Sequence, residues 1–143
     1  MALGCKKKIG VRVLKISECL VIVRGGGDLA TGTIHCLFSC GFKVLVLETG
    51  QPTTIRRLAA FSEVMYQNDI EVEGIKARRI VSQKDIEDCF ASGILPVAKD
   101  PEGVWIKRLR PQVVVDGIIA KKNLGTQINM APLVIGLGPG FCA

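Results

Sequence analysis

The stretch VIVRGGGDLATG, residues 21–32, places four glycines within twelve positions, directly after an apolar run. Gly25, Gly27 and Ala30 fit the pattern G-x-G-x-x-[G/A]. The first glycine permits a tight turn out of a strand, the second lets the backbone approach a phosphate, and the third small residue allows helix and strand to pack closely. The amino end of the helix that follows offers N–H donors and partial positive charge to an anion. We therefore predict a phosphate-binding segment made of Gly25, Gly26, Gly27, Asp28, Leu29, Ala30 and Thr31.

The elements around this loop have the order of a βαβ unit. The β-branched run 19–23 predicts a buried parallel strand. Residues 28–40 follow as a helix that Gly41 ends, and KVLVLE at 43–48 predicts a second strand. Glu48 closes that strand, where its carboxylate could accept hydrogen bonds from ribose hydroxyls and would repel a 2′-phosphate, so it favours NAD over NADP. Neighbouring helical residues point ~100° apart, so we expect one arginine of the following segment, Arg56, to reach the site.

The glycines and Asp28 each allow a second interpretation. The glycines could serve only a tight turn, with Glu48 as a solvated strand end. We expect Asp28 to cap the helix by accepting hydrogen bonds from N–H groups of its first turn, because aspartate is a good N-cap residue. The alternative is that Asp28 holds a metal ion or a water at the nucleotide.

The rest of the chain alternates strands with helices. Helices are predicted over 53–67 and over 83–91, the second with Ser82 as its N-cap. Short strands are predicted around Gly74 and over the ranges 94–100, 112–120 and 132–138. This order predicts an α/β fold, a Rossmann-like three-layer sandwich with a mostly parallel sheet. We assign residues 1–17 to an N-terminal extension and 18–143 to one Rossmann-like nucleotide-binding domain.

A second group of polar residues follows the run VVVD at 113–116. Because ligands of open α/β sheets bind outside the carboxyl ends of the strands, we expect Asp116, Lys121 and Asn123 near the crevice of the glycine loop. The alternative is an ordinary charged surface loop. GLGPGF at 136–141 is either a further anion-binding turn or the exit of the chain from the sheet.

Composition excludes several classes of protein. The formal net charge is +6, but aromatic residues make up only 5%, so stacking surfaces for nucleic acid are scarce and we predict no nucleic-acid partner. No apolar run is long enough to span a bilayer, and Lys15 and Glu18 interrupt the one that resembles a signal peptide, so we predict a cytoplasmic protein without a membrane anchor. Cys36 and Cys40, beside His35, form either part of an apolar helix face with Leu29, Thr33 and Leu37 or a thiolate metal site. Since no second cysteine pair occurs, we predict no metal.

Six stretches in a fixed order resemble a known family: VIVRGGGDLATG, LETGQPTTIRRLAAFSEVMYQ, VEGIKA, LPVAKDP, VVVDGIIAKKNLGT and APLVIGLGPGF. Together they resemble the selenium-dependent molybdenum hydroxylase accessory proteins of the YqeB type, relatives of the XdhC-type xanthine dehydrogenase accessory factors. The resemblance covers residues 20–141. By position it carries over Gly25, Gly27, Asp28, Thr31, Glu48, the arginines of the IRR segment, Asp116 and the AKKNLGT loop.

The resemblance implies a Rossmann-like domain that handles the molybdenum cofactor. It implies a nucleotide or molybdopterin dinucleotide as the ligand and a molybdenum hydroxylase, similar to xanthine dehydrogenase, as the partner. Members of the family continue past the GLGPGF turn, so we expect this chain to be either a natural short form or a domain truncated at its carboxyl end. The alternatives are an NAD-binding oxidoreductase and a non-enzymatic nucleotide-sensing module. A half-sheet with a free edge also suggests a homodimer.

Overall fold

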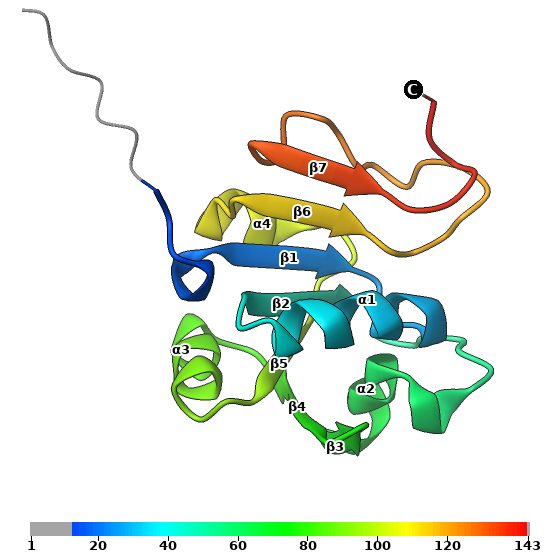
Figure 1. Cartoon of the computed structure of the whole chain (residues 1–143). Coiled ribbons are helices and arrows are strands. Elements are labelled where there is room, and N and C mark those ends of the chain that lie inside the picture. The colour runs from blue at the N-terminus through cyan, green and yellow to red at the C-terminus, as the bar shows by residue number, and fades with distance from the viewer. Residues whose placement is uncertain (1–12, 143) are drawn as a thin grey trace, which may run out of the picture.

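The computed structural model describes residues 13–142 and shows one seven-stranded sheet (Figure 1). Its strands are β1 (Leu20–Arg24), β2 (Lys43–Glu48), β3 (Asp69–Val72), β4 (Ile75–Ile80), β5 (Leu95–Lys99), β6 (Val113–Asp116) and β7 (Leu133–Gly136). Their spatial order is β3-β4-β5-β2-β1-β6-β7, and every pairing is parallel except that of β3 with β4. β1 therefore lies inside the sheet, with β2 on one side and β6 on the other.

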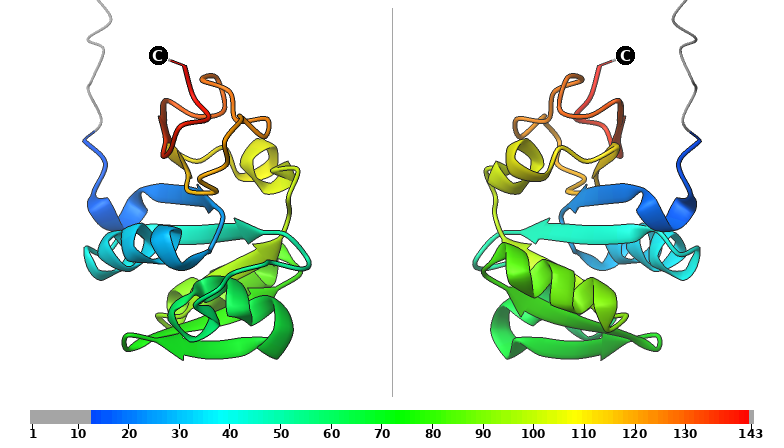
Figure 2. Two further views of the ribbon diagram at one scale, coloured as in Figure 1. Left: turned by 90° about the vertical axis from the view of Figure 1, so that its right-hand side faces the viewer. Right: turned by 90° about the vertical axis from the view of Figure 1, so that its left-hand side faces the viewer.

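Helices cover both faces of the sheet. They are α1 (Asp28–Ser39), α2 (Val64–Gln67), α3 (Gln83–Ala91) and α4 (Val104–Leu109), with 3-10 turns η1 (Ile16–Glu18), η2 (Arg57–Ala59) and η3 (Phe61–Glu63). Val21 and Val23 of β1 belong to the core beneath α1 and α2, while Ile22 belongs to the core beneath α3 and α4. This alternation follows from the two-residue period of a strand. α1 and α4 lie on opposite sides of the sheet (Figure 2). The predicted α/β three-layer architecture with a mostly parallel sheet is confirmed.

Several predicted elements are confirmed at residue level. α3 begins after Ser82 in a capping box: the Ser82 hydroxyl accepts from the Asp85 N–H, and the Asp85 carboxylate accepts from the Ser82 N–H. The segment around Gly74 is a hairpin, in which β3 and β4 are antiparallel.

The helix predicted over residues 53–67 is wrong, because only η2, η3 and the four-residue α2 form there. Residues 60–65 are buried one after another, which a one-sided surface helix does not permit. Main-chain donors are also used elsewhere: the Ser62 N–H donates to the carbonyl of Gly26, and the Phe61 N–H donates to the Thr31 hydroxyl. This segment is therefore fastened to the glycine loop.

The apolar face predicted for α1 is correct only in part, because Leu37 alone of its apolar residues packs against the core. Ala30 and Ile34 are buried, and Leu37 and Phe38 pack against the same core, whereas Leu29 is 61% exposed. Cys36 and Cys40 are exposed as well. Ala30, Ile34, Leu37 and Phe38 are spaced at i, i+4, i+7 and i+8, so they form a continuous apolar stripe on one side of α1. Burial of this stripe, rather than of Cys36 and Cys40, therefore sets which side of α1 faces the sheet.

α4 was not predicted; it begins after Gly103, which has a φ of 74°.

The predicted N-terminal extension, residues 1–17, lies mostly outside the described residues, which begin at Val13. The interrupted apolar run that resembles a signal peptide falls partly in the same undescribed segment. Within the described chain, no helix combines the length and apolar character that crossing a bilayer requires.

Candidate functional site

A cleft of about 800 Å³ opens at the carboxyl edge of the sheet. It receives residues from the ends of β1, β2 and β6, from the loop after β5 and from residues 51–55. The chain leaves β1 toward β2 on one side, and β6 flanks the other side, so the cleft lies where the strand order reverses. In open α/β sheets, this is the place where ligands bind.

The glycine loop brings three segments close together beside this cleft. Gly25 has a φ of 87°, which glycine adopts without strain, and its N–H donates to the Leu47 carbonyl at 2.7 Å. A Cβ at Gly25 would lie 3.1 Å from the Ile118 Cα, and a Cβ at Gly117 would lie 2.9 Å from the Cβ of Ala30. The small residues at 25, 30 and 117 therefore let the loops after β1 and β6 touch.

The amino end of α1 keeps two free donors at the cleft. Gly27 and Asp28 line the cleft, and among residues 13–142 no protein acceptor is bonded to either main-chain N–H. A Cβ at Gly27 would have only the Thr54 hydroxyl within 4 Å, at 3.9 Å. α1 is twelve residues long, so its macrodipole adds partial positive charge at these N–H groups. This arrangement can hold one anionic group.

Glu48 is bound to the glycine loop itself. Its Oε2 accepts from the Gly26 N–H at 2.7 Å, and its Oε1 accepts from the Thr49 N–H at 2.7 Å. Glu48 is 9% exposed, and it lines the cleft. The predicted loop of open amides is therefore partly occupied, because the Gly26 N–H is no longer available to a phosphate. Each carboxylate oxygen can accept a second hydrogen bond from a ligand hydroxyl.

Asp28 is not the N-cap of α1; Gly27 takes that position and makes no side-chain cap bond. The Asp28 carboxylate accepts from the Leu29 N–H at 3.0 Å and from Arg56 Nε at 2.8 Å. The Arg56 guanidinium holds the pKa of Asp28 below its ordinary value. Arg56 thus reaches the rim of the cleft through Asp28, and it neutralises a charge that would repel an anion at the helix end.

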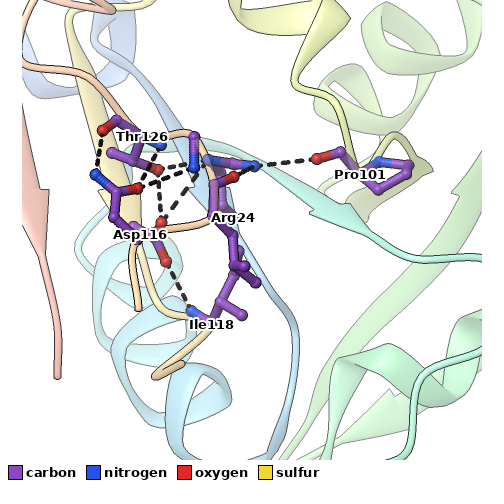
Figure 3. Close-up of polar contacts among 8 residues, drawn as sticks. Arg24, Pro101, Asp116, Ile118 and Thr126 are labelled. Carbon is purple, nitrogen blue, oxygen red and sulfur yellow. Dashed lines mark hydrogen bonds and ion pairs between the residues drawn. The ribbon is translucent and has the colours of Figure 1, made fainter. Parts of the chain in front are cut away.

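Beneath the cleft, Arg24 and Asp116 form a buried network through the Thr126 hydroxyl (Figure 3). Arg24 Nη1 donates to Thr126 Oγ1, which donates in turn to Asp116 Oδ2, while Arg24 Nη1 lies 3.8 Å from that carboxylate oxygen. Arg24 Nη2 donates to the carbonyls of Pro101 and Leu124, and Asp116 Oδ1 accepts from the Ile118 N–H. Arg24 and Asp116 are 4% and 2% exposed. This network fastens the loops after β5 and β6 to the end of β1.

Lys121 and Asn123, the other site residues predicted in the loop after β6, do not line the cleft. Asn123 binds its own loop, because its side chain accepts from the N–H groups of Gly125 and Thr126 and donates to the Thr126 carbonyl. Lys121 is exposed, and it is not among the lining residues. Gly138 and Gly140 face residues 119–122 at close range. The GLGPGF turn thus supports the loop after β6.

Of the predicted site residues, Gly25, Gly27, Asp28 and Glu48 line the cleft. The other predicted residues do not line the cleft. Gly26 is bonded to the Glu48 carboxylate, Leu29 is on the surface, Ala30 and Thr31 are in the interior, and Arg56 is bonded to Asp28. Asp116 is buried at the end of β6, and Lys121 and Asn123 lie in the loop after it. Sequence reasoning missed Arg24, the irregular segment 51–55, Asp100 and Glu102. Arg24 had a detectable signal, since it is a charged residue that ends an otherwise apolar strand.

The fold and the cleft define the class: an α/β protein of the Rossmann-like type, with a cleft at the strand reversal beside a glycine-rich turn. The chain is similar to the uncharacterized protein YqeB of Escherichia coli strain K12, with 44% identity over 124 residues. That match covers 87% of this chain and 23% of YqeB, so the chain spans about a quarter of the length of this relative. No protein-family model matches the chain, and no solved structure matches it.

Proposed function

We propose that the chain is the nucleotide-binding part of an accessory protein that matures a selenium-dependent molybdenum hydroxylase. Its ligand is a nucleotide or a molybdopterin dinucleotide. The observation that carries the proposal is the pair of free N–H groups, of Gly27 and Asp28, at the end of α1 and at the wall of an 800 Å³ cleft. The family resemblance of the six stretches supports the assignment to molybdenum cofactor handling, and the similarity to the uncharacterized protein YqeB agrees with the YqeB type of that resemblance.

The geometry suits a ligand with phosphates in its middle. A pyrophosphate at the amino end of α1 accepts from the N–H groups of Gly27 and Asp28. A ribose on one side comes within reach of the Glu48 carboxylate, which lines the same cleft. The remaining half of a dinucleotide extends toward Ile118 and Leu124, which give this wall its exposed apolar surface. The accessory protein then delivers the cofactor to, or modifies it for, the partner hydroxylase.

We place the protein in the cytoplasm, with the hydroxylase. The free thiols of Cys19, Cys36, Cys40, Cys89 and Cys142 suit a reducing compartment.

Titration of the purified protein with molybdopterin cytosine dinucleotide, molybdopterin guanine dinucleotide, NAD and nucleoside triphosphates tests the proposal. We expect at least one nucleotide-bearing ligand to bind, as measured by calorimetry. In Gly27→Asp the new carboxylate lies next to the two free N–H groups, so affinity should fall about tenfold relative to the neutral, equally sized Gly27→Asn. Equal affinity of these variants would place the ligand elsewhere, and a lack of binding by the whole panel would refute the proposal.

A second candidate is a non-enzymatic sensing module. It is favoured because Glu48, Asp100 and Asp116 all accept hydrogen bonds from main-chain N–H groups of their own chain, as structural carboxylates do. A ligand that raises the melting temperature and is recovered unchanged supports it. An NAD-linked oxidoreductase would instead change the near-ultraviolet absorbance of the nicotinamide.

A further inference from the structure

A second groove, of about 730 Å³, lies between α4 and the segment that leads into β7 (Figure 1). Its lining comes from residues 103–112 and 127–132, and it shares no residue with the cleft beside the glycine loop. Gln112 and Pro132 line the groove and directly precede β6 and β7, so it reaches the amino ends of these strands. The groove is therefore a separate site, which the proposed function does not use.

The charged side chains of this groove are all cationic. Lys107 and Arg110 line it, and among residues 13–142 neither forms a salt bridge. No aspartate or glutamate of the described chain is among the lining residues. An ammonium and a guanidinium donate hydrogen bonds and accept none. An anion in the groove therefore meets two positive charges that no carboxylate of the lining offsets.

The Gln112 side chain supplies a further donor in a fixed orientation. Its Oε1 accepts from the Leu20 N–H at 2.7 Å, which identifies the oxygen end of the amide and leaves Nε2 as the other end. The main chain of Gln112 is held as well, because its N–H donates to the Leu20 carbonyl and its carbonyl accepts from the Leu133 N–H. A donor that is held before a ligand arrives loses little conformational freedom on binding.

Ile106, Met130 and Ala131 give the groove an apolar floor. Ile106 is buried, and the other two are half-buried against the core beneath α4. Small-molecule sites are typically grooves of about 300–1,000 Å³ with an apolar lining and a few placed polar groups. A bare inorganic ion would leave this floor uncovered, so the lining suits a ligand with an apolar body beside its anionic group.

We propose that this groove binds an organic anion, in which a carboxylate, sulfonate or phosphate monoester is attached to an apolar body. The anionic group accepts hydrogen bonds from Lys107, Arg110 and Gln112 Nε2. The apolar body lies against Ile106 and Met130.

Arg110 provides a direct way to test the site with the fold intact. It ends α4 with a φ of 48°, in the left-handed region where glycine is the usual residue. Its N–H donates to the Ile106 carbonyl at 3.0 Å, and this main-chain bond closes the helix whatever the side chain is. Glycine at this position therefore removes the guanidinium without straining the backbone.

Fluorescence titration of the whole chain with anilinonaphthalene sulfonate tests the proposal, because this probe joins a sulfonate to an apolar aromatic body. Lys107→Gln and Arg110→Gln should each lower the affinity about fivefold, the effect of one charge pair at about 4 Å in water. Arg108→Gln is the matched control, since Arg108 is on the same helix, lies over the Trp105 ring and does not line the groove. It should leave the affinity unchanged.

Two further measurements separate a built site from general surface attraction. Arg110→Gly should bind the probe as weakly as Arg110→Gln, while its urea midpoint stays equal to that of the unaltered chain or rises. Octanoate should displace the probe and acetate at the same concentration should not, because only octanoate covers the apolar floor.

The proposal is overturned if the probe does not bind, if Arg108→Gln weakens binding as much as Arg110→Gln does, or if neither Lys107→Gln nor Arg110→Gln weakens it. Equal displacement by acetate and octanoate would also overturn it. None of these results bears on the proposed function, which the nucleotide titration above decides at the other cleft.

Discussion

Glu48 and Asp28 stand on either side of the Gly25–Gly27 turn and act differently. Glu48 is almost buried, and it fixes the loop by accepting from two main-chain N–H groups. Asp28 lies at the rim, and an arginine neutralises it. One carboxylate therefore shapes the loop from beneath, while the other adjusts the charge that a ligand meets at the amino end of α1.

The Asp28–Arg56 pair gives a prediction for titration. Because Arg56 lowers the folded-state pKa of Asp28 below 3.8, the stabilising effect of the pair is present above the unfolded pKa and is lost as pH falls through the folded pKa. In Arg56→Gln the Asp28 carboxyl should titrate nearer to 3.8. Carbon-detected NMR measures this shift.

Arg57→Gln is the matched control, because Arg57 pairs with Glu63 and not with Asp28. If Arg57→Gln moved the Asp28 titration as far as Arg56→Gln does, the assigned pairing would be incorrect.

Two glycines give a contrasting prediction for stability. In Gly117→Ala the new Cβ lies 2.9 Å from the Ala30 Cβ in a buried contact, so we expect a loss of about 1–3 kcal/mol in the free energy of unfolding. Gly32 lies inside α1, and a Cβ there would have no heavy atom within 4 Å, so Gly32→Ala should gain roughly 0.5–1 kcal/mol. Urea unfolding of both variants checks the opposite signs.

At the scale of elements, the loop after β6 is held in an unfavourable conformation. Ile119 has a φ of 58°, which a β-branched residue rarely adopts. The Arg24–Thr126–Asp116 network fixes one side of this loop, and Gly138 and Gly140 pack on the other. The apolar wall of the cleft at Ile118 and Leu124 depends on this support.

The Thr126 hydroxyl is the centre of that network, and its removal should be costly. Thr126→Val keeps the shape but leaves Arg24 and Asp116 without their shared partner, so we expect about 2 kcal/mol less stability. Thr126→Ser keeps the hydroxyl and should retain most of that stability. Chemical denaturation compares the two, and an equal loss in both would show that packing of the methyl group, not the hydrogen bonds, matters here.

Sequence reasoning predicted elements well where local signals agree with burial. The strands VIVR and KVLVLE and the capping box at Ser82 have both hydrophobic patterning and turn chemistry in their favour. It failed over 53–67, where main-chain donors bond to the distant glycine loop. For the candidate site, sequence reasoning singled out the loop and Glu48, which lie at the cleft, but no local pattern reveals that Glu48 would bind Gly26 or that Arg24 would join two distant loops.

At the scale of the whole molecule, β7 forms one edge of the sheet (Figure 1). Leu133 is 51% exposed and Ile135 is 40% exposed on this strand. A free edge with apolar side chains favours pairing with another chain. We propose that two copies associate here as a homodimer.

The expected result is a molecular mass that rises with protein concentration, as measured by light scattering. Ile135→Lys should suppress this rise, because a charged edge residue opposes strand pairing. Val81→Lys adds the same charge at another exposed apolar position, after β4, and should not suppress it. A concentration-independent monomer mass for the unaltered chain would exclude the homodimer.

The central place of β1 has a consequence for the order of events during synthesis. β1 meets β2 after a short stretch of chain, but its other neighbour is β6, and the Leu20 N–H donates to the Gln112 side chain across 92 positions. On a ribosome, residues up to the end of β5 can assemble five adjacent strands while one side of β1 waits unpaired. The cleft is therefore completed last, and pulse-labelling of amide hydrogens during refolding should show β2 protected before β6.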